Sequence, residues 1–211
     1  MLKVELLRYT PEGEKLIAAA AKLCYSSVGI KEIEENLEGK NIDIFLNMLM
    51  DLGHESPIEH VSFTFAISGI SRVTTHQLVR HRVGCSYSQR SQRYIEEDNF
   101  NYIIPPSIQE RPELLKKYEE TMNQLNSLYE EFAKVVPKED ARFLLPQAIE
   151  SKIMVTYSLR ALLHFLELRT CRRAQWEIQT LAWKMLKEAK KVAPLIFEDA
   201  GPGCLRGPCP E

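Results

Sequence analysis

The chain has 211 residues, of which 45% are hydrophobic and 27% are charged. These proportions predict one globular domain with a sizeable core and exclude a disordered chain. Its 27 Lys and Arg against 29 Asp and Glu give a formal net charge of -2. That balance argues against a general nucleic-acid binder, because such proteins are usually basic.

The five cysteines are odd in number and scattered, and the first residues carry charges instead of a secretory signal. A disulfide framework is therefore not expected, and a reducing cytoplasm fits best. No run approaches the roughly 18 apolar residues of a membrane span, so we expect neither a membrane nor a nucleic acid as a partner.

The first part of the chain mixes strand and helix patterns. It predicts, in order, a strand over residues 2–9, helices over 14–24, 29–38 and 41–52, a helical turn within 54–60, a strand over 61–69 and a helix over 71–82. The helix over 41–52 is expected to bury Ile42, Ile44, Phe45, Met48, Leu49 and Leu52. Gly53 is expected to cap its C-terminal end.

Residues 54–60, HESPIEH, contain side chains of the types that bind metals. The spacing of His54, Glu59 and His60 is not H-E-x-x-H, however, and Pro57 interrupts the helix that such a zinc site needs. We therefore expect no metal here, and a capping or ligand-orienting role for this turn. A metal hydrolase built on His54 and His60 remains a competing hypothesis.

Residues 71–94 form a cationic segment, and no acid occurs from His60 through Ile95. Its cations, apart from two histidines, are Arg72, Arg80, Arg82, Arg90 and Arg93. Arginine without lysine favours bidentate recognition of phosphate or carboxylate. Interspersed Ser and Gln add neutral hydrogen-bonding groups. The segment therefore predicts a pocket for a phosphorylated, ring-bearing ligand, with Gln77 and Arg80 on one helical face.

The second part begins with a Pro-bounded linker and a long helix that Pro112 opens. This helix carries a heptad seam of Leu115, Tyr118, Met122, Leu125, Tyr129, Phe132 and Val136, which indicates packing within the chain or between subunits. A short helix then ends near Arg142, whose apolar neighbours suggest that it reaches an anion. A central strand over 149–158 and two helices separated near 170–174 follow.

A second cationic segment covers residues 158–173, with four arginines against the single acid Glu167. Surface salt bridging is the ordinary role of such residues. Because Arg160 and Arg169 emerge from a strongly apolar helix, we expect at least one of them to lie over a cleft.

HESPIEH, FTF, QLVRHRVGCSYSQRSQRY, LRALLHFLELR and AQWEIQ, in this order, resemble the flavin-dependent thymidylate synthases. The family signature places Ser seven residues after an RHR triplet, whereas here eight residues, Val83 to Arg90, precede Ser91. If Gly84 absorbs the extra residue in a turn, the alignment downstream is intact.

The resemblance implies an α+β fold, with helices around a small, mostly antiparallel sheet. It implies a single α+β catalytic domain over residues 1–198 and a Gly/Pro/Cys tail over 199–211, assembled as a homotetramer with active sites between subunits. The implied reaction makes dTMP from dUMP with bound FAD, and with NADPH and methylenetetrahydrofolate as co-substrates.

The resemblance also implies residue roles. Arg169 would be the catalytic residue, stabilising uracil after loss of the N3 proton, so no activated cysteine is needed. For dUMP it indicates Gln77, Arg80, Gln89, Ser91, Gln92, Arg93, Arg142 and Arg169. For FAD it indicates Ser56, Arg80, His81, Arg82, Gln89, Ser158, Arg160 and His164. The alternative is a non-catalytic nucleotide- or RNA-binding module that uses Tyr87 and Tyr94 beside the arginines.

Overall fold

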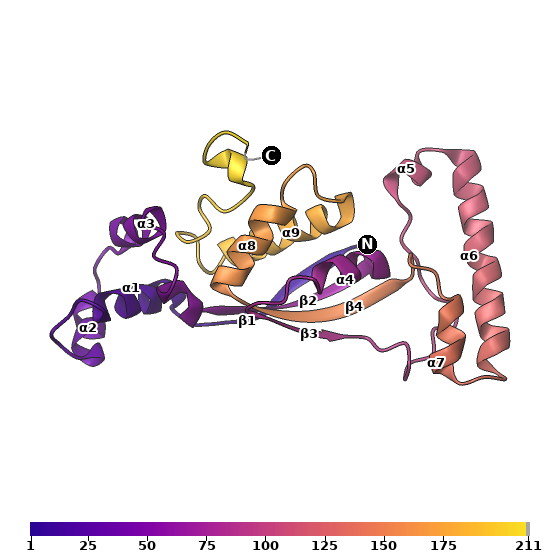
Figure 1. Cartoon of the computed structure of the whole chain (residues 1–211), viewed down its shortest axis with the longest axis horizontal. Helices are drawn as coiled ribbons and strands as arrows, with labels where there is room; N and C mark the ends of the chain where they lie inside the picture. The colour runs from indigo at the N-terminus through magenta and orange to yellow at the C-terminus, as the bar shows by residue number, and fades with distance from the viewer. Residues whose placement is uncertain (210–211) are drawn as a thin grey trace. The chain divides into compact units, whose positions relative to one another are not determined.

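A computed structural model describes residues 1–209 of the chain. It contains one sheet with the strand order β1 (Lys3–Tyr9), β2 (Ser62–Ser71), β4 (Glu150–Ser158) and β3 (Cys85–Gln89), as Figure 1 shows. The larger helices are α1 (Gly13–Leu23), α2 (Ile30–Leu37), α3 (Asp43–Asp51), α4 (Arg72–Leu78), α6 (Pro112–Ala133), α8 (Leu159–Arg169) and α9 (Trp176–Lys190). Shorter helical segments are η1 (Pro57–His60), α5 (Pro106–Gln109), α7 (Lys138–Ala141), η2 (Arg142–Leu144) and η3 (Gly203–Leu205).

The sheet is antiparallel, as the hydrogen bonds between its central strands show. At one end of the β2–β4 pair the N–H of Leu159 donates to the carbonyl of Val61 at 2.8 Å. At the other end the N–H of Arg72 donates to the carbonyl of Ile149 at 3.0 Å. The predictions of a central strand over 149–158 and of an α+β fold are confirmed, and β3 lies at an edge of the sheet.

Each central strand ends in a serine that caps the next helix. Ser71 follows β2 and accepts a hydrogen bond from the N–H of Thr74 at 3.1 Å. Ser158 follows β4 and accepts one from the N–H of Ala161 at 3.3 Å. Such caps satisfy N–H groups that the first helical turn leaves without partners. The caps fix where α4 and α8 begin.

The chain divides into two compact units. The first unit comprises Met1–Lys3, Ile67–Arg80 and Ser88–Ile153, and the second comprises Val4–Ala66, His81–Tyr87 and Met154–Glu211. In the first unit, Phe100, Met122 and Ile149 form the centre of an apolar cluster. In the second unit, aromatic rings pack edge to face, with Phe63 and Phe197 centroids 5.4 Å apart. Each unit is thus organised around its own part of the sheet.

The heptad seam of α6 is partly buried within the first unit. Met122 and Tyr129 are buried, and Tyr118 and Leu125 pack against the apolar cluster. Phe132 is 43% exposed, and the helix ends before Val136. The middle of the seam therefore serves intramolecular packing.

Two predictions about helices were wrong in detail. The helix expected over 71–82 ends at Leu78, so Arg80 lies in the turn after it and does not share its face with Gln77. In α3, Leu46 and Leu49 are buried, whereas Ile44 is 85% and Leu52 61% exposed. This helix is apolar almost all round, so periodicity could not identify its buried face. Gly53, with φ 66°, follows it as predicted.

Within residues 1–209, no helix has the length and apolar character needed to cross a membrane. The predicted boundary between a domain over 1–198 and a tail remains a prediction. Up to residue 209 the tail packs within the second unit, to which it belongs: Arg206 pairs with Glu167 at 2.9 Å, and Ala200 is buried.

Candidate active site

The predicted ligand residues divide between the two units. The first unit holds Gln77, Arg80, Gln89, Ser91, Gln92, Arg93 and Arg142. The second holds Ser56, His81, Arg82, Ser158, Arg160, His164 and Arg169. With Arg169 as the exception, the residues expected to bind dUMP lie in the first unit. The residues expected to bind only FAD lie in the second.

Gln89, at the end of β3, uses its side-chain amide nitrogen for two hydrogen bonds within the protein. This nitrogen donates to the hydroxyl oxygens of Thr75 and Ser151, at 2.9 Å in both cases. An amide group has two N–H donors and one carbonyl acceptor. The side-chain oxygen of Gln89 therefore remains as its group for a ligand.

Arg93 and Arg142 meet at one residue, Glu139 on α7. The Nε of Arg93 lies 2.5 Å from a carboxylate oxygen of Glu139. The Nε of Arg142 donates to the backbone carbonyl of the same glutamate at 3.0 Å. The Ser91 hydroxyl accepts a hydrogen bond from the N–H of Arg93 at 3.2 Å. Three predicted ligand residues are thus connected, and an acid that the sequence analysis did not single out joins two of them.

A buried acid anchors the segment that follows Arg93. Glu97 is 5% exposed, and its carboxylate lies 3.3 Å from the guanidinium of Arg90. Its N–H donates to the hydroxyl of Tyr129 on α6 at 3.1 Å. Burial raises the pKa of Glu97 above its usual value, while Arg90, Arg72 and Lys152 act in the opposite direction. The long helix therefore holds the loop that carries Ser91 and Arg93.

In the second unit, His81 contacts the predicted catalytic arginine. The Nε of Arg169 donates to the Nε2 of His81 at 3.0 Å, so this ring nitrogen carries no proton. The Tyr87 hydroxyl donates to the carbonyl of His81 at 2.6 Å and anchors its backbone. The His81 ring also packs edge to face on Phe165, with centroids 5.0 Å apart. A fixed, neutral imidazole thereby orients the Arg169 guanidinium.

The charge state of His81 follows from its surroundings. Burial, then the nearby Arg169, then His164, lower its pKa from 6.5 to about 4. Between these two pH values the unfolded chain binds a proton that the folded chain does not. The contribution of His81 to the free energy of unfolding is therefore complete above pH 6.5 and is lost as the pH falls to about 4.

We expect the His81 imidazole to titrate with a midpoint near pH 4 in an NMR titration of the folded protein, because Arg169 and burial oppose its protonation. The variant His81→Asn assigns the signal. A midpoint near the ordinary value of about 6.5 would show that the contact with Arg169 does not persist in solution.

Arg160 lies beside two acids and at the edge of a cavity. Its guanidinium contacts Glu55 at 2.7 Å and Glu59 at 2.6 Å, which raise its pKa. The cavity of about 680 Å³ is lined by Arg160, by His54 and His164, by apolar residues that include Leu163 of α8, and by the acids Asp51, Glu55, Glu167 and Asp199. Ser56 and Arg160 also line a neighbouring cavity of about 410 Å³. This region presents cationic, acidic, polar and apolar side chains.

Gly84 precedes a strand of regular register. Its carbonyl accepts a hydrogen bond from the N–H of Ser158, and the N–H of Arg90 donates to the carbonyl of Lys152 farther along the same pair of strands. Both bonds belong to one register, so β3 carries no bulge between them. Gly84 itself has φ 68°. That the turn at Gly84 absorbs the extra residue stays a prediction.

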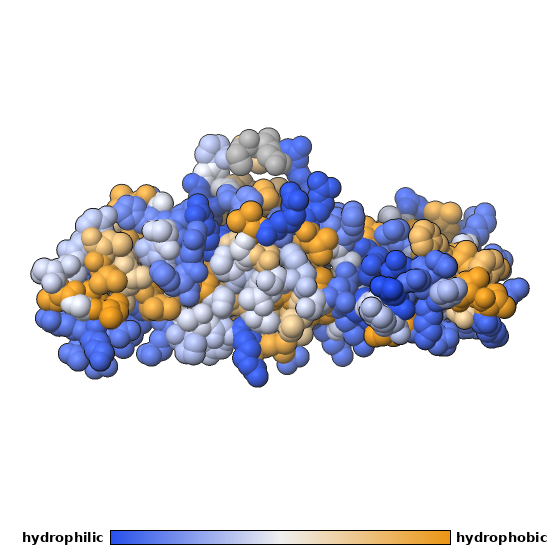
Figure 2. Space-filling view, turned by 60° about the horizontal axis from the view of Figure 1, so that its bottom comes forward, coloured by the Kyte–Doolittle hydropathy of each residue, from blue (hydrophilic) through white to orange (hydrophobic). Residues whose placement is uncertain are grey.

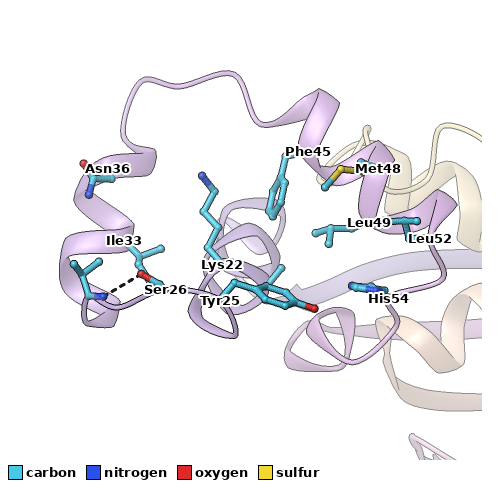
Figure 3. A pocket seen from close by; sticks show the side chains of 12 residues that line it. Lys22, Tyr25, Ser26, Ile33, Asn36, Phe45, Met48, Leu49, Leu52 and His54 are labelled. Carbon is cyan, nitrogen blue, oxygen red and sulfur yellow. Dashed lines mark hydrogen bonds between the residues drawn. The ribbon is translucent and has the colours of Figure 1, made fainter.

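A second large pocket, of about 690 Å³, lies among α1, α2 and α3. In Figure 3 the Tyr25 ring and His54 point toward one another at its base. The Lys22 ammonium lies 5.3 Å from the ring centroid of Phe45. Aromatic and apolar walls with one cation suit a planar ligand that carries negative charge.

The sequence analysis missed this pocket and the acids that hold the arginines. Lys22 was placed in a predicted helix and Phe45 in the core of another, and Tyr25 was given no role. Glu139 stands three residues before Arg142, a spacing that indicates contact on one helical turn. That signal could have suggested Glu139, although it is the backbone carbonyl that contacts Arg142.

The chain matches known proteins over nearly its whole length. A family model described as thymidylate synthase complementing protein matches residues 5–195. The chain is 51% identical to a flavin-dependent thymidylate synthase of Geobacter sulfurreducens and 49% identical to one of Clostridium tetani. Each alignment covers 100% of this chain and 91% of the relative.

Among solved structures, a UMP/dUMP methylase of Streptomyces cacaoi, bound with 5-bromo-dUMP, has a TM-score of 0.78 to this chain. The match covers 94% of this chain and 93% of the other at 24% identity, and shows that the fold is shared.

Proposed function

This chain belongs to the flavin-dependent thymidylate synthase family, and from that premise we propose its full reaction. It methylates dUMP reductively to dTMP, with FAD as its bound cofactor. Methylenetetrahydrofolate donates the carbon and leaves as tetrahydrofolate, and NADPH supplies the reducing electrons. The contact between Arg169 and a neutral His81 is the observation that carries the proposal.

The uracil ring must become nucleophilic at C5 before it can accept a carbon unit. Loss of the N3 proton, with a fixed cation beside the resulting anion, achieves this without a cysteine adduct. Because the Nε of Arg169 donates its hydrogen bond to His81, the terminal nitrogens of the guanidinium remain as donors for uracil. His81 acts as a positioning residue in this step, because it sets the direction of the guanidinium.

The residues of the second unit fit FAD. A dinucleotide needs a cation for its pyrophosphate and surfaces for its rings; Arg160 supports the first requirement, and His164 with the apolar part of the cavity supports the second. Ser56, Arg82 and Ser158 would add hydrogen bonds, while Glu55 and Glu59 orient Arg160. When bound and reduced by NADPH, the flavin would supply the hydride for the reduction. Arg80 and Gln89 are proposed for both FAD and dUMP.

For dUMP, we propose that Arg93 and Arg142 bind the phosphate. Gln77, Gln89, Ser91 and Gln92 would contact uracil and ribose, and the free oxygen of Gln89 can accept from a ring N–H. Ser91 is a hydrogen-bonding residue in this scheme, since its hydroxyl accepts from Arg93 and has no base beside it in the described contacts.

The proposed co-substrates and assembly have support of their own. The pocket with Lys22, Tyr25 and Phe45 has the apolar walls and the cation that the rings and carboxylates of a folate require. Figure 2 shows hydrophobic surface at the end formed by α1–α3, where Tyr25 is 82% and Ile44 85% exposed. Such surface supports burial against other copies in a homotetramer, which light scattering would test. The free cysteines among residues 1–209 support a cytoplasmic location.

We expect the purified protein to bind FAD with a change in flavin absorbance. It should then form dTMP and tetrahydrofolate from dUMP, methylenetetrahydrofolate and NADPH. Omitting each component in turn identifies which are required. Absence of FAD binding, or dihydrofolate as the folate product, would contradict the proposed reaction.

A further inference from the structure

Glu139 occupies the two arginines proposed to bind phosphate. Its carboxylate contacts Arg93, and its backbone carbonyl accepts from Arg142. Among residues 1–209, no hydrogen-bond acceptor contacts the terminal nitrogens of Arg142, so they remain as donors for a ligand. Glu139 therefore contacts both arginines of the proposed phosphate subsite.

The contact between Arg93 and Glu139 is of the kind that a ligand can replace. The side chains are 56% and 45% exposed, and exposed ion pairs contribute little to stability because water screens them. A carboxylate and a phosphate both present oxygens to the guanidinium fork, but a nucleotide phosphate carries more charge and more acceptors. We therefore expect a phosphate to displace the Glu139 carboxylate from Arg93, whereas a neutral group would not.

We propose that Glu139 sets the affinity of the proposed dUMP site for the phosphate. Its carboxylate holds Arg93 and competes with the incoming phosphate for this arginine. The competition lowers the affinity for dUMP. The inference rests on the proposed function, in which Arg93 and Arg142 bind the dUMP phosphate.

The test is the dUMP dissociation constant of Glu139→Gln, measured by calorimetry on the FAD-bound enzyme. Glutamine keeps the size and removes the charge, so we expect dUMP to bind about two- to fivefold more tightly, the range of an exposed ion pair. The KM for dUMP should fall while kcat stays unchanged. Deoxyuridine, which has no phosphate, should bind both proteins equally.

Glu96→Gln is the matched control. Glu96 pairs with Lys138 at 2.9 Å and is 46% exposed, close to the exposure of Glu139, but it contacts neither Arg93 nor Arg142. It should leave dUMP affinity unchanged. If Glu96→Gln tightened dUMP binding as much as Glu139→Gln, the loss of any nearby negative charge would explain the effect, and the proposed competition would be rejected. The melting temperature of each variant checks folding.

The remaining outcomes separate the two proposals. If the unaltered enzyme binds dUMP and Arg93→Ala weakens binding more than tenfold, the phosphate assignment holds. An unchanged or weaker affinity in Glu139→Gln then rejects the competition alone. If Arg93→Ala has no effect, or the unaltered enzyme does not bind dUMP, the assignment in the proposed function fails and the competition fails with it.

Discussion

Arg169→Ala is expected to lose dTMP formation by a factor of about 10² to 10³ while it retains bound flavin. The guanidinium is the only cation that contacts His81 by a hydrogen bond in the described structure, and it is proposed to stabilise the uracil anion. Losing one preorganised donor to a developing charge has this size of effect in other enzymes. Single-turnover dTMP formation at saturating dUMP measures it.

Two further variants sharpen this result. Arg172→Ala removes an exposed arginine just beyond α8 and should leave turnover unchanged. Arg169→Lys keeps the charge but loses the planar guanidinium with its Nε donor to His81, so we expect intermediate activity. Turnover of Arg169→Ala near that of the unaltered enzyme would remove Arg169 from the mechanism.

Gly84→Ala is expected to lower the free energy of unfolding by about 2 to 4 kcal/mol. Gly84 has φ 68°, a region that side chains with a Cβ rarely adopt. An added Cβ would also lie 2.5 Å from the Ser158 hydroxyl and 3.0 Å from the Ala161 side chain. The substitution therefore strains the turn and disturbs the cap of α8. Urea unfolding followed by circular dichroism measures the loss.

Gly39→Ala separates the two causes. Gly39 has φ 66°, nearly that of Gly84, but nothing lies within 4 Å of the position its Cβ would take. Gly39→Ala should lower the free energy of unfolding only by the cost of the backbone conformation, about 1 to 2 kcal/mol. Equal losses in both variants would mean that the close approach to Ser158 costs nothing.

Sequence periodicity located the elements well wherever one face of an element is polar. The strand over 150–158 alternates buried and less buried residues, and α9 buries Ile178, Leu181 and Met185 on one face. The pattern failed on α3, where apolar residues surround the helix and only tertiary packing selects Leu46. It also placed the end of α4 too late, because no Gly or Pro marks the stop at Leu78.

The candidate ligand residues were predicted from residue type and resemblance, but their partners could not be. Nothing local in the sequence indicates that Arg169 meets His81, or that Glu139 meets Arg93, because these contacts join distant segments. Composition pointed to segments rich in arginine and poor in acids. In the structure, Arg90, Arg93 and Arg160 each contact an acid from outside their own cationic segment. The fold, and not the local sequence, supplies the acids that balance these arginines.

The turn at Gly84 has a consequence for the strand that follows it, because the position of an added residue decides which side of the sheet each side chain of β3 faces. Side chains alternate sides in β3, and Tyr87 and Gln89 share one side, where the first anchors His81 and the second bonds Thr75 and Ser151. One residue added inside the strand would shift its frame and send both side chains to the opposite side. Added in the turn, it changes only the length of the connection. The loop before β3 can therefore vary in length while Tyr87 and Gln89 keep their contacts.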